Sequence, residues 1–240
     1  MSAQPTILIC HETVAEGTMR FHFAKPAGFD FVPGQFVEIT LIDPPETDGE
    51  GNARAFSLVS TPAEPELSVT TRLRDTAFKR VFRQLQPGAK FLVDGPMGSF
   101  TLHRNSSKPA VFLAGGIGIT PFHSIIKHAA ENLLPHKIVL FYSNRRPEDA
   151  AFLDELQALE KKNKNFRLVA SMSEMEKSSR PWSGETGFID AAMLQRHLPS
   201  LAGPIYYVAG PPAMVTAMRA MLEKAQVDPD DIRTEEFSGY

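Results

Sequence analysis

The stretch Pro109–Pro121 constrains the fold more than any other part of the chain. It opens with a continuous apolar run, Ala110–Ala114, which favours a strand buried on both faces of a parallel sheet. The glycines that follow are Gly115, Gly116 and Gly118. Next come Thr120 and Pro121, which suit the N-cap and the first position of a helix. Because glycine permits a tight turn and a helix N-terminus presents free N–H groups, the stretch predicts a strand, a phosphate-binding loop and a helix.

This loop is not the usual dinucleotide-binding fingerprint. In a G-x-G-x-x-G motif the third glycine would stand where the chain has Pro121. The next strand candidate, 137–142, is followed by Ser143–Arg146, which lacks the acidic residue that commonly binds a ribose. A glycine turn that serves only packing remains the alternative, so the loop alone leaves its ligand open.

Composition excludes several classes of protein. The chain has 240 residues, enough for one large domain or two ordinary ones, and its formal net charge of −3 disfavours a general nucleic-acid binder. With Cys10 as its one cysteine, a chain cannot form an internal disulfide or a cysteine-ligated iron–sulfur cluster, and no metal site is expected. No apolar segment is long enough to cross a bilayer, and residues 1–10 do not resemble a secretory signal. We therefore expect a cytoplasmic protein.

Short strands and turns dominate the chain up to His103. The strand candidates are 6–11, 19–23, 35–41, 53–59, 67–73 and 90–94. One helix interrupts them, with Asp75 or Thr76 as its cap and an apolar face that includes Phe78 and Phe82. Many short strands separated by turn signals favour a β-barrel or a sandwich.

The second half changes to an alternating pattern. Its strand candidates are 110–114, 137–142, 166–170 and 205–209. Helical stretches follow Thr120, Glu148 and Pro211, which predicts βαβ units around a parallel sheet. The polar segment Arg104–Lys108 is the expected join. The sequence thus predicts two domains, 1–103 and 104–240.

Four stretches in this order carry a resemblance to a known family. They are Arg54–Ser57, Gly95–Phe100, Gly115–Pro121 and Tyr207–Val215. They resemble motifs of the ferredoxin–NADP reductase superfamily. Arg54–Ser57 resembles its Arg-x-Tyr-Ser signature, and Gly95–Phe100 resembles its Gly-Pro-x-Gly-x-Phe segment. Gly115–Pro121 resembles its nicotinamide-domain loop, and Tyr207–Val215 resembles its Cys-Gly-Pro-Pro-x-Met-Val segment. The resemblance covers almost the whole chain. It implies an antiparallel, Greek-key flavin barrel followed by an α/β domain that binds a nicotinamide nucleotide.

The resemblance also implies a flavin site in the barrel. Arg54 would hold the flavin phosphate, Phe56 would stack on or beside the isoalloxazine, and Ser57 would hydrogen-bond near N5. Alternation along a strand places Arg54 and Phe56 on one face. A strand with a core Phe and a surface Arg is the alternative. The residues implied to bind the flavin are Arg54, Ala55, Phe56, Ser57, Thr70, Thr71, Arg72 and Thr76.

The nicotinamide site is implied in the same way. The residues implied to bind the nucleotide are Gly115, Gly116, Gly118, Thr120, Pro121, Arg145, Ala209, Gly210, Pro211 and Pro212. Ser57 and Phe237 would be the catalytic residues, since Phe237 or Tyr240 would cover the flavin face that the nicotinamide must reach. A frayed terminus is the alternative for both aromatics.

The chain departs from the family pattern at four places. Phe56 replaces the usual Tyr, and Ala209 stands where the family often has Cys, which removes the thiol beside the nicotinamide but leaves space. Phe78 and Lys79 occupy positions where the family often places a Ser or Thr against the pyrophosphate. Met172 takes the place of the Arg that commonly binds the 2′-phosphate of NADPH, which favours NADH. Against this, Arg145 and the arginine after it end the second strand of the sheet.

Together these features predict an FAD-dependent oxidoreductase that takes hydride from NAD(P)H. With no cluster of its own, it would pass electrons to a separate acceptor, which we expect to be a ferredoxin- or flavodoxin-like protein or an oxygenase component. A basic rim for an acidic partner would comprise Arg72, Arg74, Lys79, Arg80 and Arg83, of which Lys79, Arg80 and Arg83 also read as an ordinary solvated face. The alternatives are a small-molecule flavin or ferric reductase (a diaphorase), and a non-catalytic flavin-binding sensor, regulatory or electron-transfer subunit.

Overall fold

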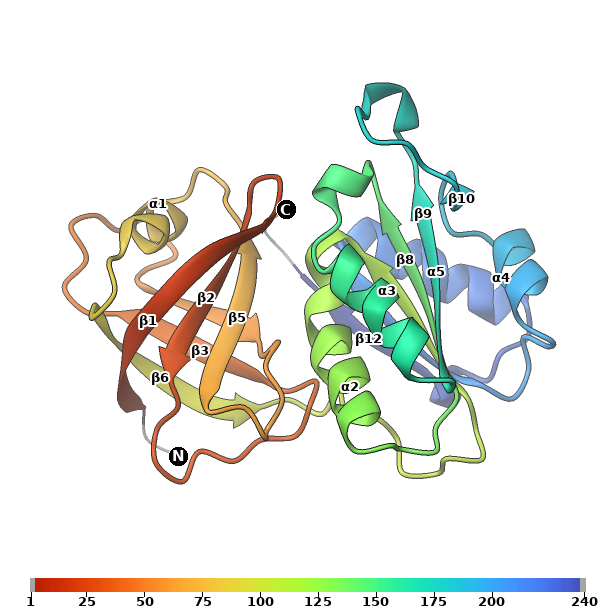
Figure 1. Cartoon of the computed structure of the whole chain (residues 1–240), viewed down its shortest axis with the longest axis horizontal. Helices are drawn as coiled ribbons and strands as arrows, with labels where there is room; N and C mark the ends of the chain where they lie inside the picture. Colours follow the sequence, from red (N-terminus) through yellow and green to blue (C-terminus); the bar gives the residue numbers. More distant parts are fainter. Residues whose placement is uncertain (1–2, 238–240) are drawn as a thin grey trace.

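A computed structural model describes residues 3–237, which form two halves lying side by side (Figure 1). The first half contains β1 (Gln4–Ala15), β2 (Thr18–Ala24), β3 (Phe36–Leu41), β4 (Ala53–Ser57), β5 (Glu66–Arg72), α1 (Ala77–Gln84) and β6 (Lys90–Met97). The strands form one antiparallel sheet in the order β4-β3-β6-β1-β2-β5. A bridge between Leu58, just beyond β4, and Val69 of β5 joins the two edge strands. The predicted antiparallel barrel is therefore confirmed.

Aromatic side chains fill the barrel and hold α1 on it. The ring of Phe82 stacks on Phe21 with centroids 4.0 Å apart, and Phe78 is also buried. The helix begins after Thr76, whose side chain accepts a hydrogen bond from the backbone N–H of Lys79 at 3.3 Å. This is the N-cap arrangement that the sequence predicts, with the apolar face turned to the core.

The second half is a parallel sheet between two layers of helices. It contains β7 (Ala110–Gly115), α2 (Ile119–Glu131), β8 (Ile138–Asn144), α3 (Leu153–Lys162), β9 (Phe166–Met172), β10 (Glu185–Thr186), α4 (Ala191–His197), β11 (Ile205–Gly210), α5 (Pro212–Lys224) and β12 (Ile232–Glu236). The strand order is β10-β9-β8-β7-β11-β12, all parallel. On β7, Phe112 packs in the cluster with α2 and α3, while Val111 and Leu113 pack in the cluster with α4 and α5. The α/β prediction is confirmed. Among residues 3–237, no helix has the length and apolar character needed to span a membrane.

The start of α2 corrects one prediction. Thr120 is not the N-cap: a 3-10 turn at Gly116–Gly118 leads into the helix, which begins at Ile119. Thr120 is buried, and its hydroxyl donates instead to the Ile117 carbonyl at 3.0 Å. Gly118, the last residue of the turn, already has right-handed helical angles (φ −56°, ψ −5°), so the helix starts earlier than a cap at Thr120 would place it.

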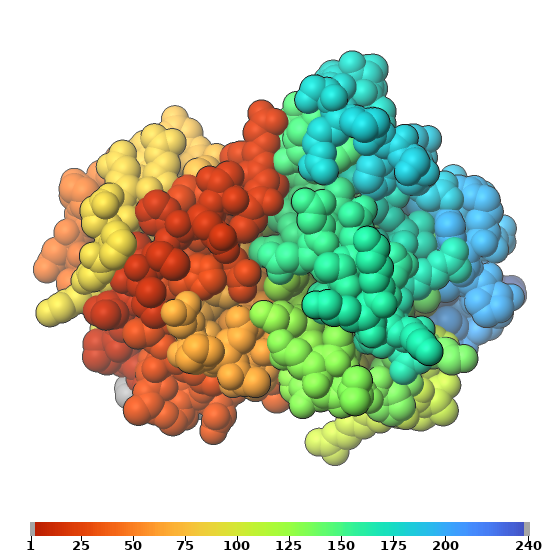
Figure 2. All heavy atoms as spheres, in the orientation of Figure 1, coloured from red at the N-terminus to blue at the C-terminus, as the bar shows by residue number. Residues whose placement is uncertain are grey.

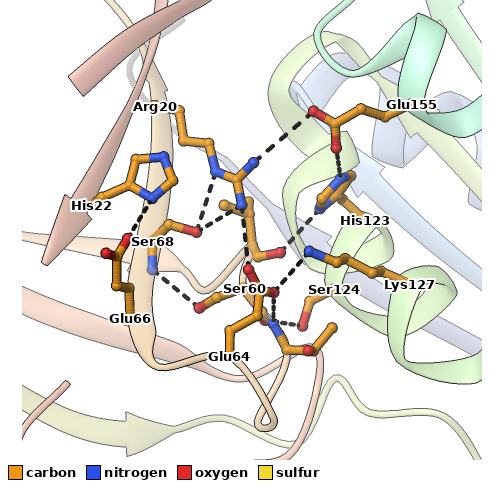
Figure 3. A network of polar contacts seen from close by, with 12 residues as sticks. Arg20, His22, Ser60, Glu64, Glu66, Ser68, His123, Ser124, Lys127 and Glu155 are labelled. Atoms are coloured by element: carbon orange, nitrogen blue, oxygen red, sulfur yellow. Dashed lines mark hydrogen bonds and ion pairs between the residues drawn. The ribbon is translucent and has the colours of Figure 1, made fainter. Parts of the chain in front are cut away.

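Figure 2 shows the two halves in contact with each other, and polar side chains lie between them. Figure 3 shows this interface network. Arg20 of β2 is 6% exposed; its Nη2 donates to Ser68 Oγ at 3.1 Å, and its guanidinium lies 4.0 Å from the carboxylate of Glu155 on α3. On α2, Lys127 Nζ lies 3.0 Å from an oxygen of Glu64. Charges from both sheets thus meet in one network.

His123 and Ser124 of α2 fix the barrel through its main chain. The His123 ring is fully buried, with Nδ1 3.0 Å from the carbonyl oxygen of Val59 and Nε2 2.9 Å from Glu155 Oε2. Ser124 Oγ donates to the carbonyl of Ser60 at 2.7 Å. The segment directly after β4 is therefore held by the helix that follows the glycine loop.

Candidate functional site

The glycine loop lies at the carboxyl edge of the parallel sheet, where the ends of β7 and β11 are neighbours. Gly115 and Gly118 are buried there; a Cβ on Gly115 would clash with Met214, and one on Gly118 with the Ala209 carbonyl oxygen. Gly116 has a φ of +55° and is half-buried. Two of the three glycines thus serve close packing, and Gly116 is the one that faces outward from the sheet edge.

Arg72 reaches from the barrel to this loop. Its guanidinium Nη2 would lie 3.5 Å from a Cβ placed on Gly116, and the same atom donates to the Asp149 carbonyl at 3.5 Å. Its charge helps to hold the pKa of the Asp149 carboxyl below its usual value, although the hydrogen bond from Arg146 contributes most. The sequence places Arg72 among the flavin residues, whereas its side chain lies on the nucleotide side of the interface.

The end of β11 gathers most of the remaining predicted nucleotide residues. Ala209 pairs with Ala114 of β7 and is fully buried, so the predicted space beside it is not exposed. Pro211 caps α5 and Pro212 is its first residue. Gly210, with φ +158°, accepts a hydrogen bond from the Phe237 backbone N–H at 3.0 Å. Phe237 therefore lies at this edge of the sheet, while Tyr240 lies outside the described residues.

Glu235 is a site residue that the sequence reasoning missed. It stands opposite Ala209 in the β11–β12 register. Its Oε2 is buried and has no hydrogen-bond partner among the described residues, and burial raises the pKa of this carboxyl to about 7. Recognising β12 as a strand that ends the parallel sheet would have placed Glu235 here, because parallel strands bring their carboxyl ends to one edge.

On the flavin side, Arg54 is already engaged by its own loop. Its Nη1 donates to the carbonyls of Glu50, Gly51 and Ala53 at 3.0, 3.1 and 2.7 Å. Its Nη2 lies 3.0 Å from Asp48 Oδ1 and 2.9 Å from Glu50 Oε2. The cation predicted to hold the flavin phosphate is thus paired with two carboxylates.

Phe56 does not present a stacking surface. It is 8% exposed and packs in the barrel core against Phe82, with centroids 5.7 Å apart and the rings 14° from parallel. The ring centre of Phe78, also on α1, lies 5.8 Å from that of Phe56. The two helix phenylalanines cover the ring that the resemblance assigns to the isoalloxazine. Ala55, between Arg54 and Phe56, is exposed.

Three hydroxyls near the end of β4 and β5 suit a polar ligand. Ser57, Thr70 and Thr71 are each 5% exposed or less. Thr71 Oγ1 donates to the Arg72 carbonyl at 3.3 Å, but Thr70 Oγ1 has no hydrogen-bond partner among residues 3–237. An unpaired buried hydroxyl is costly, so it favours a site completed by a bound group.

The predicted basic residues lie in two places, at the start of α1 and at the end of β8. Lys79 is half-buried, and burial, with the nearby charges of Arg74 and Arg54, lowers its pKa. Arg80 is bound to Glu46 and Asp75 at 2.7 and 2.6 Å. At the end of β8, Arg145 has a side chain that is 67% exposed and lies 3.8 Å from Glu174. Cations therefore gather at the start of α1, close to the predicted flavin phosphate.

These residues fit an FAD in part. Arg54, Lys79 and the α1 N-terminus form a donor set suited to a diphosphate, and the unpaired Thr70 hydroxyl of β5 is a separate polar group suited to a ligand. The acidic partners of Arg54 occupy that set in this conformation. Cavities of about 400 Å³ beside Lys127 and Leu159, and of about 290 Å³ between β1 and α3, lie away from these residues.

Comparison with known proteins places the chain in a family. Residues 112–220 match the oxidoreductase NAD-binding domain. The chain is 29% identical over 234 residues to the glycine betaine monooxygenase reductase subunit of Chromohalobacter salexigens, covering 96% of this chain but 62% of that protein. It thus spans about six tenths of the length of such reductase components, 62% and 63% in two cases.

A solved structure and a second relative match over most of their own length. The structure of a ferredoxin NADP+ reductase from Neisseria gonorrhoeae superposes with a TM-score of 0.81 at 23% identity, covering 98% of both chains, which confirms the fold. Ferredoxin–NADP reductase B of Sorangium cellulosum is 30% identical over 210 residues, which cover 85% of this chain and 83% of that protein. The chain therefore belongs to the ferredoxin–NADP reductase superfamily.

Proposed function

We propose that the chain is an FAD-dependent oxidoreductase that takes hydride from NAD(P)H and passes electrons to a separate acceptor. One observation carries the proposal: the glycine loop of the α/β domain faces the end of barrel strand β5, so that Arg72 lies over Gly116. A nucleotide bound at the loop would therefore lie directly against the barrel. Family membership and the match to an oxidoreductase NAD-binding domain support the predicted FAD and NAD(P)H.

The residues of the chain would bind and orient the two cofactors. When bound, FAD supplies a group that accepts a hydride and releases electrons one or two at a time. Gly116 and Arg72 would hold the nucleotide pyrophosphate, and Gly210 and Pro211 would border the nicotinamide. Ser57 and Thr70 would contact the flavin, with Phe237 as the aromatic beside the nicotinamide position. These groups would act by positioning and by excluding water.

The domain boundary at 103/104 and a cytoplasmic location remain part of this proposal. The last barrel strand ends at Met97 and the first strand of the parallel sheet begins at Ala110, which supports a boundary between them. His103 itself packs on the second domain, since its Nδ1 lies 3.0 Å from the hydroxyl of Tyr207. NADH is the proposed donor, because Met172 at the end of β9 is buried and Arg145 is held near Glu174.

A small redox protein is the proposed acceptor. Several relatives are reductase components by name, among them those for propane 2-monooxygenase and for anthranilate 1,2-dioxygenase. Arg74 and Arg83 are exposed and remain available to an acidic partner, whereas Arg80 is already paired. Reduction of cytochrome c by NADH, with and without candidate ferredoxins over a salt series, tests this. Fast ferric or flavin reduction without any ferredoxin effect would favour the diaphorase alternative.

Absorbance spectra test the oxidoreductase itself. The purified protein should take up FAD, show flavin bands and lose them when NADH is added without oxygen. Protein that binds no added FAD would contradict the proposal, and flavin that does not bleach would favour the sensor alternative.

Substitution of Arg72 tests the assignment of the nucleotide side. Arg72→Ala should raise the KM for NADH tenfold or more while bound flavin is retained, since a charge-assisted hydrogen bond contributes about 1.5–3 kcal/mol and about 1.4 kcal/mol corresponds to tenfold. Arg74→Ala, at an exposed neighbouring position, is the control and should leave KM within about twofold. Loss of flavin from the Arg72 variant, with the KM for NADH unchanged, would mean that Arg72 binds the flavin and not the nicotinamide nucleotide.

A further inference from the structure

The loop between β3 and β4 places a carboxylate where the predicted flavin phosphate would bind. Asp48 Oδ1 accepts from Arg54 Nη2 at 3.0 Å, and Asp48 Oδ2 accepts from the Ala77 backbone N–H, the first of α1, at 3.1 Å. One side chain thus bridges the arginine and the helix N-terminus. We propose that Asp48, with Glu50, is an internal anion that competes with the diphosphate of FAD for Arg54 and α1.

The charges around Asp48 suit a phosphate group. The Arg54 guanidinium lies 5.3 Å from the ring centre of Phe78, on the first turn of α1. Lys79, on the same turn, is close enough to Arg54 and Arg74 for their charges to act on it. Hydrogen bonds from Glu50 N and Ala77 N, and one from Arg54, hold the pKa of Asp48 below its ordinary value against desolvation. The carboxylate therefore stays charged and neutralises part of a cationic cluster.

Asp48 and its neighbour leave Arg54 little capacity for a ligand. Both terminal nitrogens of its guanidinium are occupied, Nη1 by three loop carbonyls and Nη2 by Asp48 and Glu50. A diphosphate can reach these nitrogens only if the two carboxylates move away. The affinity of the chain for FAD is then reduced by the free energy of that displacement.

The loop is built to move without disturbing the barrel. Its base is closed by Leu41 and Asn52, because Leu41 N donates to Asn52 O at 2.9 Å and Asn52 Nδ2 donates to Leu41 O at 2.8 Å. The segment between them, 42–51, lies outside β3 and β4 and is exposed at nearly every position. Its second tether is Glu46, which is paired with Arg80 of α1. Opening therefore breaks ion pairs at the surface and the hydrogen bonds of the loop with Arg54 and Ala77 N, but no strand pairing.

The inference rests on the proposed FAD site and can be tested apart from it. Flavin is removed from wild type, Asp48→Asn and the double variant Asp48→Asn/Glu50→Gln, and FAD binding is measured by the change in flavin fluorescence. Asn keeps the shape of Asp but loses the charge and one of the two acceptor oxygens, so it can accept either from Arg54 and Glu50 N or from Ala77 N. We expect FAD to bind three- to tenfold more tightly to the single variant and tighter still to the double variant. Asp43→Asn is the control, because among the described residues Asp43 bonds to neither Arg54 nor α1. The affinity of this variant for FAD should match that of wild type.

Hydrogen exchange on the wild-type protein gives a second readout. Adding FAD should speed exchange at Glu50 and Gly51, whose amides donate to the Asp48 side chain and carbonyl. Equal FAD affinity in wild type and both variants, or unchanged exchange on FAD binding, would overturn the role of Asp48 and leave the oxidoreductase proposal intact. Absence of FAD binding by wild type and variants alike would instead overturn the proposed function.

Discussion

Replacing His123 with alanine should weaken the contact between the two halves of the molecule. The imidazole Nδ1 lies 3.0 Å from the Val59 carbonyl oxygen and Nε2 lies 2.9 Å from Glu155 Oε2; since both partners are acceptors, the ring makes both hydrogen bonds when both of its nitrogens carry a proton. A neutral hydrogen bond contributes about 1 kcal/mol, and one to a charged group about 1.5–3 kcal/mol. Because half of the Glu155 side chain is exposed, we take the lower end for that bond. The expected loss is about 2–3 kcal/mol in the free energy of unfolding.

Urea unfolding followed by circular dichroism measures this loss as a lower midpoint. The control is His128→Ala, on the same helix, whose ring contacts the side chain of Asn132 one turn away; we expect a change below about 0.5 kcal/mol. The bond from His123 also lowers the pKa of Glu155. The stability from Glu155 is thus present above the unfolded carboxyl pKa and lost as pH falls, and the His123 variant should lose less on acidification. A His123 variant no less stable than the His128 variant would refute the interface argument.

Two further predictions concern the sheet edge. Burial raises the pKa of Glu235 to about 7, so its contribution to stability is full below the unfolded value of 4.5 and is lost as pH rises through 7. This decline amounts to at most about 3 kcal/mol. Thermal melts should show that Glu235→Gln removes it. Wild type and variant with parallel melting-temperature profiles between pH 4 and 8 would contradict it. Gly118→Ala should cost about 1–3 kcal/mol, because the new methyl meets the Ala209 carbonyl, whereas Gly49→Ala, with open space around it, should be neutral by urea unfolding. Equal midpoints for these two variants would argue against the close packing at the loop.

The sequence was sufficient for the architecture because its patterns are local. Alternating strands before His103 and buried strands separated by helices after it predict the barrel and the parallel sheet, and both are confirmed. The helix α4 and the edge strands β10 and β12 were missed. They are short and partly exposed, so their periodicity is weak.

The predicted site residues remain predictions, and their contacts were not predictable. The strand pattern places Arg54 and Phe56 on one face, but it cannot tell that Asp48, in an irregular loop, pairs with the arginine. Nor does it tell that helix phenylalanines cover Phe56. Arg72 was named among the flavin residues as a substitute cation near the pyrophosphate, and the strand pattern cannot tell that its long side chain reaches Gly116. Such contacts depend on tertiary distances that no local pattern encodes.

The two main-chain carbonyls held by α2 have a consequence for how the protein tolerates change. Val59 and Ser60 contribute only backbone oxygens to His123 and Ser124, so substitutions of their side chains leave these bonds available. These bonds from α2 therefore help to set the spacing between the end of β4, where Ser57 lies, and the glycine loop. Drift in the barrel sequence would alter flavin contacts while leaving this spacing intact, whereas changes on α2 would alter it without touching either ligand.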